Sequence, residues 1–289
     1  MGLRTKFNLV LLLVFALGLG VSGYVSYNLL QGNARDEVLR NAGVIMEAAL
    51  SMRHYTQKTI SPKLDYQPDT FLPESVPAFA ATEMMNQLRV KYSDYNYKEA
   101  VLNPMNLRDR AVEWETDVVN AFRSDAAQGE LTGTRSAATG QSLYLARPLI
   151  VSEEGCLACH STPDRAQAAM IKLYGPNNGF GWKLRETVGA QIVSVPMTLP
   201  IANANRAFYT FMASLTGVFV VLFIILNVML SVLIVRPITD MSEAANEIST
   251  GNMTIPEFAD RGKDEMALLA KSFNRMRRSL AKAISLIDQ

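Results

Sequence analysis

Cysteine and histidine are scarce in this sequence of 289 residues, which contains two of each. Two cysteines are too few for a small scaffold held together by disulfides, and two histidines leave little room for an all-protein zinc site. An excess of positive charge is also lacking, because 28 Lys and Arg stand against 27 Asp and Glu. Nucleic-acid-binding domains normally carry a basic surplus. The composition therefore predicts no nucleic-acid partner.

Charge is missing altogether from two long runs, residues 7–34 and 207–235. Each run exceeds the about 20 apolar residues that cross a bilayer, and a backbone in hydrocarbon must satisfy its own hydrogen bonds as a helix. We therefore expect transmembrane helices at 7–30 and 207–235. A cleaved signal peptide is the alternative for the first run. Its apolar stretch outlasts a typical signal core and no A-x-A site ends it, which favours a retained anchor.

The basic residues Arg4 and Lys6 precede the first run and predict a cytoplasmic N-terminus over residues 1–6. Two spans then leave residues 31–205 outside the membrane and return residues 236–289 to the cytoplasm. We expect the chain in a bacterial inner (cytoplasmic) membrane, with its outside domain in the periplasm.

Both cysteines lie in one pentapeptide, Cys156-Leu157-Ala158-Cys159-His160. Cys-x-x-Cys-His is the attachment signature of c-type haem. Two thiols at this spacing reach the two haem vinyl groups, and the following histidine becomes an axial ligand of the iron. A redox dithiol or a structural disulfide is the alternative, but a thioredoxin-type motif is expected early, between a strand and a helix. The motif predicts one covalent haem c.

The other face of the iron has several candidate ligands. His54 is the one remaining histidine, and it follows the first apolar run in an expected continuous helix. Methionine is the competing ligand, and an open coordination position is the third alternative. The methionine candidates are Met46 and Met52, followed by Met84, Met85 and Met105.

The outside domain is expected to be α+β. Runs rich in Val, Ile and Leu predict strands over Gln141–Val151 and Thr187–Val195. Apolar residues at helical spacing predict a helix over Asn106–Arg123, and Thr82 is expected to cap a short amphipathic helix. Helices that flank a small antiparallel sheet indicate a PAS-like sensor domain.

Several motifs accompany the Cys156–His160 pentapeptide. Together they resemble the periplasmic single-haem c, PAS-like sensor family, first described as a domain of unknown function, over about residues 35–200. The resemblance implies one covalent haem c and a role in redox or gas sensing. Some relatives use a cysteine of the N-terminal helix as sixth ligand; this chain has none there, which makes His54 the natural substitute. The motifs are Asn103-Pro104-x-Asn106-x-x-Asp109, Ala146-Arg147-Pro148, Tyr174-Gly175, Gly179-Phe180-Gly181-Trp182-Lys183 and Val188-Gly189-Ala190-x-Ile192-Val193-x-Val195-Pro196.

Four further residues are candidates for the haem environment. Arg53, Arg147 and Lys183 carry charges that can pair with haem propionates, and Trp182 is a candidate for the pocket wall. The alternative is that the three cations are ordinary surface charges.

Two seams of apolar residues follow the second run. They are separated by Gly251 and Pro256, and Arg236-Pro237-Ile238 begins the first. This arrangement resembles a HAMP linker domain, which implies an all-α parallel coiled-coil segment and a homodimer paired through HAMP and the transmembrane helices. A generic coiled coil is the alternative. The seams are Ile238, Met241, Ala245 and Ile248, then Met266, Leu269, Phe273, Met276, Leu280, Ala283 and Ile287.

The order of these parts predicts a membrane-anchored haem c sensor. It would detect redox state or a small gas outside the membrane and signal through HAMP to a partner protein, because no output domain is recognisable before Gln289. The alternative is a membrane-anchored c-type cytochrome that carries electrons, which needs no HAMP domain. An enzyme such as a peroxidase is not expected, because His54 is the sole distal acid–base candidate.

Overall fold

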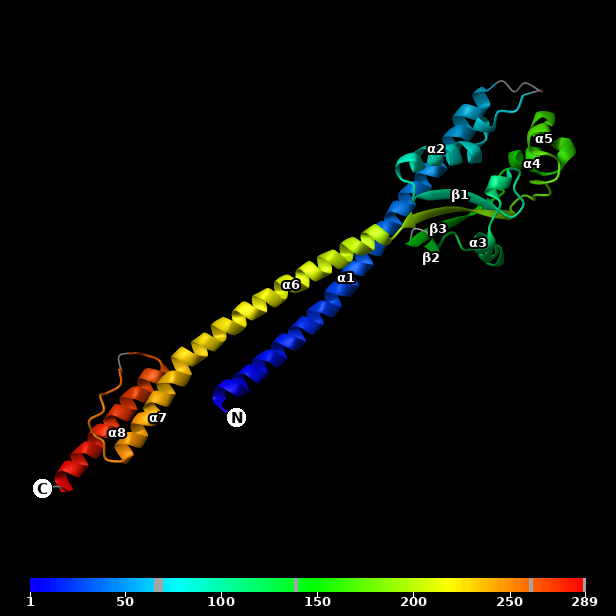
Figure 1. The fold of residues 1–289 in the computed structure, drawn as a ribbon. Helices are drawn as coiled ribbons and strands as arrows, with labels where there is room; N and C mark the ends of the chain where they lie inside the picture. The colour runs from blue at the N-terminus through cyan, green and yellow to red at the C-terminus, as the bar shows by residue number, and fades with distance from the viewer. Residues whose placement is uncertain (65–69, 138–139, 260–261, 288–289) are drawn as a thin grey trace. The chain divides into compact units, whose positions relative to one another are not determined.

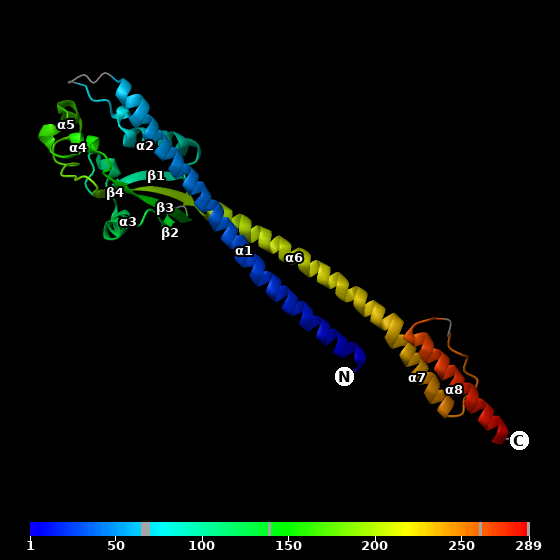
Figure 2. The same ribbon diagram turned by 180° about the vertical axis from the view of Figure 1, so that it is seen from behind.

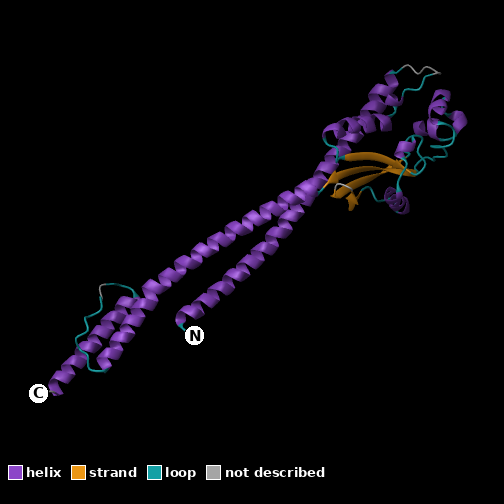
Figure 3. Ribbon diagram, viewed as in Figure 1, coloured by secondary structure: helices purple, strands orange, loops and turns teal. Residues whose placement is uncertain are grey.

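The computed structural model describes residues 1–64, 70–137, 140–259 and 262–287. It divides into two compact units, Tyr27–Ala207 on the one hand and Met1–Ser26 with Phe208–Gln289 on the other. Figure 3 shows that the strands belong to the first unit, whereas the second unit is helical.

Helices of the Tyr27–Ala207 unit surround one small sheet (Figure 1). Pro77 occupies the first turn of α2, where the missing N–H costs little. Short π- and 3-10 segments lie at Thr56–Ile60, Ser61–Lys63, Pro73–Ser75, Leu107–Asp109 and Pro163–Arg165. The α-helices are α1 (Leu3–Tyr55, which begins in the other unit), α2 (Pro77–Lys91), α3 (Glu113–Ser124), α4 (Glu154–His160), α5 (Ala168–Tyr174) and the start of α6 (Thr198–Met229).

The sheet is antiparallel and four-stranded, in the order β1-β4-β3-β2 (Figure 2). In its register, Ala100 of β1 lies opposite Ala190 of β4, and Ala146 of β3 lies opposite Ile192 of β4. The C-terminal strand β4 is therefore central and is paired along both edges. The strands are β1 (Asn96–Val101), β2 (Leu131–Ala137), β3 (Gly140–Ile150) and β4 (Thr187–Pro196).

Both faces of the sheet are covered by helices, which explains why eight consecutive residues of β4, Val188–Val195, are buried. The first face packs against α1 and α2, and the second packs against α3. The first core contains Val38, Ala42, Met46 and Ala49 of α1 with Ala81, Met85, Leu143, Leu145, Val193 and Val195. The second contains Val118, Val119 and Phe122 of α3 with Ala100, Ala146, Ala190 and Ile192.

Two helical segments, Leu3–Lys63 and Thr198–Ser249, are long and apolar enough to cross a membrane. In the most apolar 18-residue windows of these segments 0% and 6% of the residues are buried, so the windows themselves are not packed into a core. Inside the unit formed by Met1–Ser26 and Phe208–Gln289, the rings of Phe15 and Phe219 stack with centroids 4.7 Å apart.

The C-terminal part contains two helices, α7 (Arg236–Ser249) and α8 (Glu265–Ile287). The buried amide of Asn274 holds the connector between them, because its Nδ2 donates to Phe258 O at 2.9 Å and its Oδ1 accepts from Phe258 N at 3.1 Å. The side chains buried here are Met241, Ala244 and Ile248 of α7 and Ala267, Ala270 and Asn274 of α8.

The predicted seams are only partly buried within one chain. Met241 and Ile248 are buried, but Ile238 is 42% exposed. On α8 the side chains of Leu269, Met276 and Leu280 are exposed, and the side chain of Ile287 lies outside the described residues.

The expected fold class is confirmed: a long apolar helix, a small antiparallel α+β domain and a helical C-terminal region. The strands expected at Gln141–Val151 and Thr187–Val195 are β3 and β4. The helix expected over Asn106–Arg123 is wrong in its first half, because α3 begins at Glu113. The capping role expected of Thr82 is also wrong: this residue lies inside α2 and its hydroxyl donates to Ala78 O at 2.9 Å.

Gly189 is a position where β1 and β4 approach too closely for a side chain. A Cβ there would lie 2.4 Å from Ala100 O and 2.9 Å from Val101 Cγ2. We expect Gly189→Ala to force the strands apart and to lower the free energy of unfolding by about 1–3 kcal/mol. Thermal unfolding of the detergent-solubilised chain, followed by circular dichroism, measures this. The matched control is Gly129→Ala, whose methyl meets no atom within 4 Å; equal melting temperatures for the two variants would contradict the expectation.

Candidate functional site

The short helix α4 carries both cysteines on one face. Cys156 and Cys159 are three residues apart, a spacing that makes side chains neighbours on a helix surface, and His160 is the last residue of α4. Both thiols are free and partly exposed. Burial raises the pKa of the Cys159 thiol, and Cys156 adds to this shift. The helix therefore presents two reduced sulfur atoms next to an imidazole.

The imidazole of His160 is held on two sides. Its Nδ1 lies 2.7 Å from Gly179 O, and its ring stacks on Trp182 with centroids 3.9 Å apart and planes 5° from parallel. Burial lowers the pKa of His160, and a neutral imidazole that donates from Nδ1 keeps its lone pair on Nε2. The geometry therefore prepares Nε2 as an acceptor or ligand atom.

The carbonyl that orients His160 depends on a glycine. Gly179 has φ +81°, and a Cβ there would lie 2.7 Å from Met105 N and Cα. Its N–H donates to Asn103 Oδ1 at 3.3 Å, and Asn103 Nδ2 donates to Phe180 O at 3.5 Å. Two motifs far apart in the sequence thus meet behind the imidazole.

The π-helical segment Thr56–Ile60, which directly follows α1, lies beside the start of the cysteine helix. Glu153, which precedes α4, accepts from Gln57 Nε2 at 2.9 Å and lies 3.6 Å from Lys58 Nζ. Its backbone oxygen also accepts from Cys156 N at 3.1 Å. Glu153 therefore joins the helix that contains the first apolar run to the helix that bears the thiols.

A buried ion pair lies on the α1 face of β1. Both carboxylate oxygens of Glu99 accept from the Arg53 guanidinium, and the Glu99 side chain is 3% exposed. Tyr97 donates to Glu99 Oε1 at 2.9 Å, and Gln191 donates to the Tyr97 oxygen at 3.4 Å. Burial, followed by the charge of Glu99, raises the pKa of Tyr97. Arg53 lies within electrostatic range of Cys156 as well.

Asp109 adds a partly buried carboxyl to this region. Burial raises its pKa to about 6. The charge of Arg108, whose Nε lies 3.6 Å from Asp109 Oδ1, opposes this shift, and Glu99 reinforces it. The Asp109 carboxyl therefore loses its proton closer to neutral pH than an ordinary aspartate does.

The structure brings some of the predicted site residues together and separates others. Cys156, Cys159, His160 and Trp182 form one cluster. Arg53 is turned to Glu99, and Arg147 is paired with Glu47 at 2.6 Å and Glu130 at 3.0 Å, so these guanidinium groups already have carboxylate partners. The Lys183 side chain is exposed.

The candidate sixth ligands also differ in their surroundings. His54 is exposed near the end of α1. Met46 is fully buried in the core between α1 and the sheet, and Met52 packs against that core. Met85 is buried in the same core and Met84 packs on it. Met105 packs its backbone against Gly179.

Sequence reasoning missed several residues that build the site. Glu99, Tyr97 and Glu153 carry no motif and gave no signal of their own. Asn103 and Gly179 belong to two of the quoted motifs, but nothing in the sequence indicated that these two motifs meet. Ser161, directly after His160, has a buried Oγ with no hydrogen-bond partner in the part of the chain that the structure describes.

Among residues 1–64, 70–137, 140–259 and 262–287, no group of three or more His, Cys, Asp or Glu is placed to hold a bare metal ion.

The structure has a small α+β domain between two membrane-capable helices, followed by a helical pair. The chain belongs to the Tll0287-like family, whose model, described as Tll0287, matches residues 31–196. A HAMP domain model matches residues 229–282. These matches confirm the order of domains that the resemblance predicted, a Tll0287-like domain followed by HAMP, which is the architecture of a membrane signalling sensor.

Two individual proteins are similar to parts of the chain. The sensor histidine kinase WalK of Bacillus subtilis (strain 168) is 33% identical over 104 residues, which are 36% of this chain and 17% of that protein. The chain therefore spans less than a fifth of that kinase's length. The crystal structure of the cyanobacterial heme-protein Tll0287 has a TM-score of 0.44 at 16% identity, and the likeness covers 55% of this chain and 95% of that one.

The pair Arg53–Glu99 is expected to contribute strongly to stability. Removing one partner leaves the other buried without its counter-charge, so we expect Arg53→Ala to cost about 3–5 kcal/mol. Chemical unfolding of the detergent-solubilised chain measures the loss. Lys58→Ala is the matched control on the next turn of the same segment. It removes an ion pair whose side chains are 55% and 51% exposed, which is expected to cost about 0–1 kcal/mol. A cost below that of the control would contradict a structural role for Arg53.

Proposed function

We propose that the chain is a membrane-anchored sensor that carries one covalent haem c. The observation that supports it best is the geometry of α4, in which two free thiols stand beside an imidazole whose Nδ1 is held by Gly179 O at 2.7 Å. In this proposal the thiols of Cys156 and Cys159 form the two thioether links, and Nε2 of His160 is the proximal ligand. Bound haem would supply a redox-active iron whose coordination responds to oxidation state or to a small gas.

The surroundings fit this group chemically. The thiols are partly exposed and therefore reachable, and the aromatic face of Trp182 lies against His160. The buried hydroxyl of Ser161, orphaned among the described residues, is a polar atom that a propionate can satisfy. Arg53 and Arg147 serve the domain as ion-pair partners of Glu99, Glu47 and Glu130, which makes them weaker propionate candidates.

For the sixth ligand we propose His54. Gln57 and Lys58, three and four residues further on, both reach Glu153. His54 is exposed one residue before the end of α1, close in the chain to these two contacts with the segment that precedes Cys156. Met46 is buried in the core between α1 and the sheet, and the backbone of Met105 packs against Gly179, whose carbonyl holds Nδ1 of His160.

Signalling in this proposal starts from the end of α1. A change in the bond at His54 alters the contacts of a helix that is continuous from Leu3 to Tyr55, and differential contact energy is what any two-state switch requires. The apolar runs 7–30 and 207–235 cross the bacterial inner membrane, with the Tll0287-like domain in the periplasm and HAMP in the cytoplasm. The exposed side chains of Leu269, Met276 and Leu280 favour pairing with a second copy in HAMP, and a downstream signalling protein receives the output.

The second candidate function is a membrane-anchored electron carrier. Free cysteines next to a histidine suit both functions, but the HAMP match favours the sensor. Added CO or NO separates the two: the carrier keeps its visible spectrum unchanged in both oxidation states. We expect no enzymatic activity from the chain itself.

Covalent attachment is tested by expressing the full chain with a cytochrome c maturation system. We expect one haem per chain that survives a denaturing gel and gives a c-type pyridine haemochrome spectrum. The variant Cys156→Ser/Cys159→Ser should lose it entirely because both thioether links are gone. Ser152→Ala, an exposed position shortly before the motif, is the control and should retain it. A wild-type chain that leaves the maturation system with a Cys156–Cys159 disulfide and no haem would refute the proposal.

The axial assignment makes a separate prediction. We expect His54→Ala to convert a six-coordinate, low-spin ferric spectrum into a five-coordinate, high-spin one, because the distal bond is lost. Met52→Leu, two residues earlier on α1, is the matched control and should leave the spectrum unchanged. Visible absorption and magnetic circular dichroism report both. If Met52→Leu changes the spectrum and His54→Ala does not, methionine is the ligand.

A further inference from the structure

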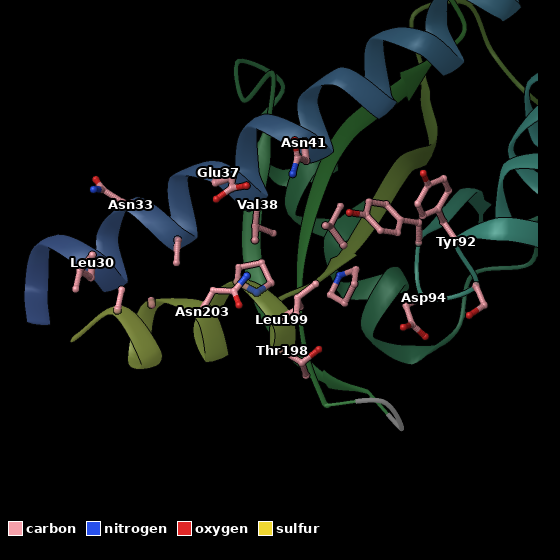
Figure 4. A pocket seen from close by; sticks show the side chains of 18 of the residues that line it. Leu30, Asn33, Glu37, Val38, Asn41, Tyr92, Asp94, Thr198, Leu199 and Asn203 are labelled. Atoms are coloured by element: carbon pink, nitrogen blue, oxygen red, sulfur yellow. The ribbon is translucent and has the colours of Figure 1, made fainter. Parts of the chain in front are cut away.

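An open cavity of about 550 Å³ lies in the Tyr27–Ala207 unit, away from the cysteine helix. Its volume is within the ~300–1,000 Å³ usual for small-molecule sites. Figure 4 shows side chains from α1 along one side, from the start of α6 along another, and from the turn with Tyr92 and Asp94 at one end. Buried Val38 and Ala204 form part of its floor. The cavity is an open groove.

The groove changes from apolar to polar along its length. Leu30 lies at one end and Asn41 is 11 residues further along α1, which is about 16 Å at ~1.5 Å per residue. Leu30 belongs to the charge-free run 7–34, and Ala207, also in the lining, begins the charge-free run 207–235. One end of the groove therefore borders the segments that are proposed to enter the membrane. The other end is lined by polar residues and lies outside these segments.

The polar end combines charges of both signs. Glu37 of α1 and Asp94 of the turn are exposed carboxylates in the lining, and Lys91 is the cation. The Lys91 ammonium lies 5.8 Å from the centroid of the Tyr92 ring, whose side chain is half exposed. The amides of Asn33, Asn41 and Asn203 add donors and acceptors. Such a set matches a ligand that presents a phosphate and an ammonium together.

We propose that this groove binds the headgroup of a zwitterionic lipid with a primary ammonium, of the phosphatidylethanolamine class. Asp94 receives the ammonium and Lys91, three residues earlier in the chain, receives the phosphate, while Glu37 adds negative charge on the α1 side. The apolar end near Leu30 and Ala207 guides the acyl chains toward the bilayer. Two carboxylates against one lysine disfavour a purely anionic headgroup. A lipid held between α1 and the start of α6 couples membrane composition to the two helices that leave the sensor domain.

The inference rests on the proposed membrane placement and is independent of haem. The full chain is therefore first extracted from membranes at alkaline pH. A chain released into the soluble fraction would remove the membrane placement and the lipid site together. If the chain stays in the membrane fraction, the lipid experiment that follows tests the groove alone.

The membrane-embedded chain is then purified and offered an equimolar mixture of dioleoyl phosphatidylethanolamine, phosphatidylglycerol and phosphatidylcholine, and bound lipid is counted by native mass spectrometry. We expect the ethanolamine lipid to be preferred about tenfold over the other two lipids. This is the ratio of affinities that one additional charge-assisted interaction provides. The variant Glu37→Gln/Asp94→Asn should lose this preference. Asp36→Asn, an exposed carboxylate next to Glu37 on α1 but outside the lining, is the matched control and should keep it.

Other outcomes overturn the assignment. Equal retention of the three lipids by the wild-type chain, or an unchanged preference in the double variant, refutes a headgroup site in the groove. Glycerophosphoethanolamine has the same headgroup without acyl chains and is added as a competitor. If it displaces the lipid at equal concentration, the ligand is a soluble phosphoethanolamine compound and the lipid assignment fails.

Discussion

One helix, α1, belongs at once to the first apolar run and to the core of the sensor domain, and the rest of the domain depends on this shared use. Ala42 and Met46 of α1 are completely buried against the sheet, so the domain has no complete core without the helix. The bond between Arg53 and Glu99 then favours one position of the helix on the sheet, because rotation or sliding would leave the buried Glu99 charge unpaired at an energetic cost. A helix held in this way can transmit a local change along its axis.

The candidate site uses backbone groups where many sites use side chains. The orientation of His160 depends on the carbonyl of Gly179 and therefore on a left-handed backbone conformation that glycine adopts at no steric cost. Asn103 holds this backbone from the other side of the domain. The aromatic ring of Trp182 completes the support. This arrangement sets the tautomer of the His160 imidazole through a neutral carbonyl. Because no charged partner is present among the described residues, the partly buried imidazole stays neutral.

The elements predicted correctly from the sequence are those whose signal is local. Strands β3 and β4 read as apolar runs, and the two membrane-capable helices read as runs without charge. Strand β1 was not predicted because Lys98 and Glu99 interrupt it, and their partners come from other elements: Lys98 Nζ lies 2.6 Å from Glu115 of α3, and Glu99 is paired with Arg53 of α1. A charged strand interior is stable when tertiary contacts neutralise it.

The helix expected to start at Asn106 failed for a related reason. Apolar spacing alone favoured it, but Ala111 N donates to Val101 O at 2.9 Å, and the chain there joins the end of β1. Backbone hydrogen bonds to a neighbouring strand outweighed helical propensity. Similarly, the heptad spacing of α8 identified apolar residues but not which of them one chain buries on its own.

The sequence by itself determined the two apolar runs, the Cys-x-x-Cys-His spacing and the HAMP-type linker, because each depends on composition or spacing within a single stretch of chain. Only the tertiary structure decided that Arg53 faces Glu99, that Gly179 orients His160, and that α1, α6 and the turn at Tyr92 enclose a groove. The first two of these contacts join residues 46 and 19 positions apart in the chain. Their energies come from burial and complementary charge, which no single segment contains.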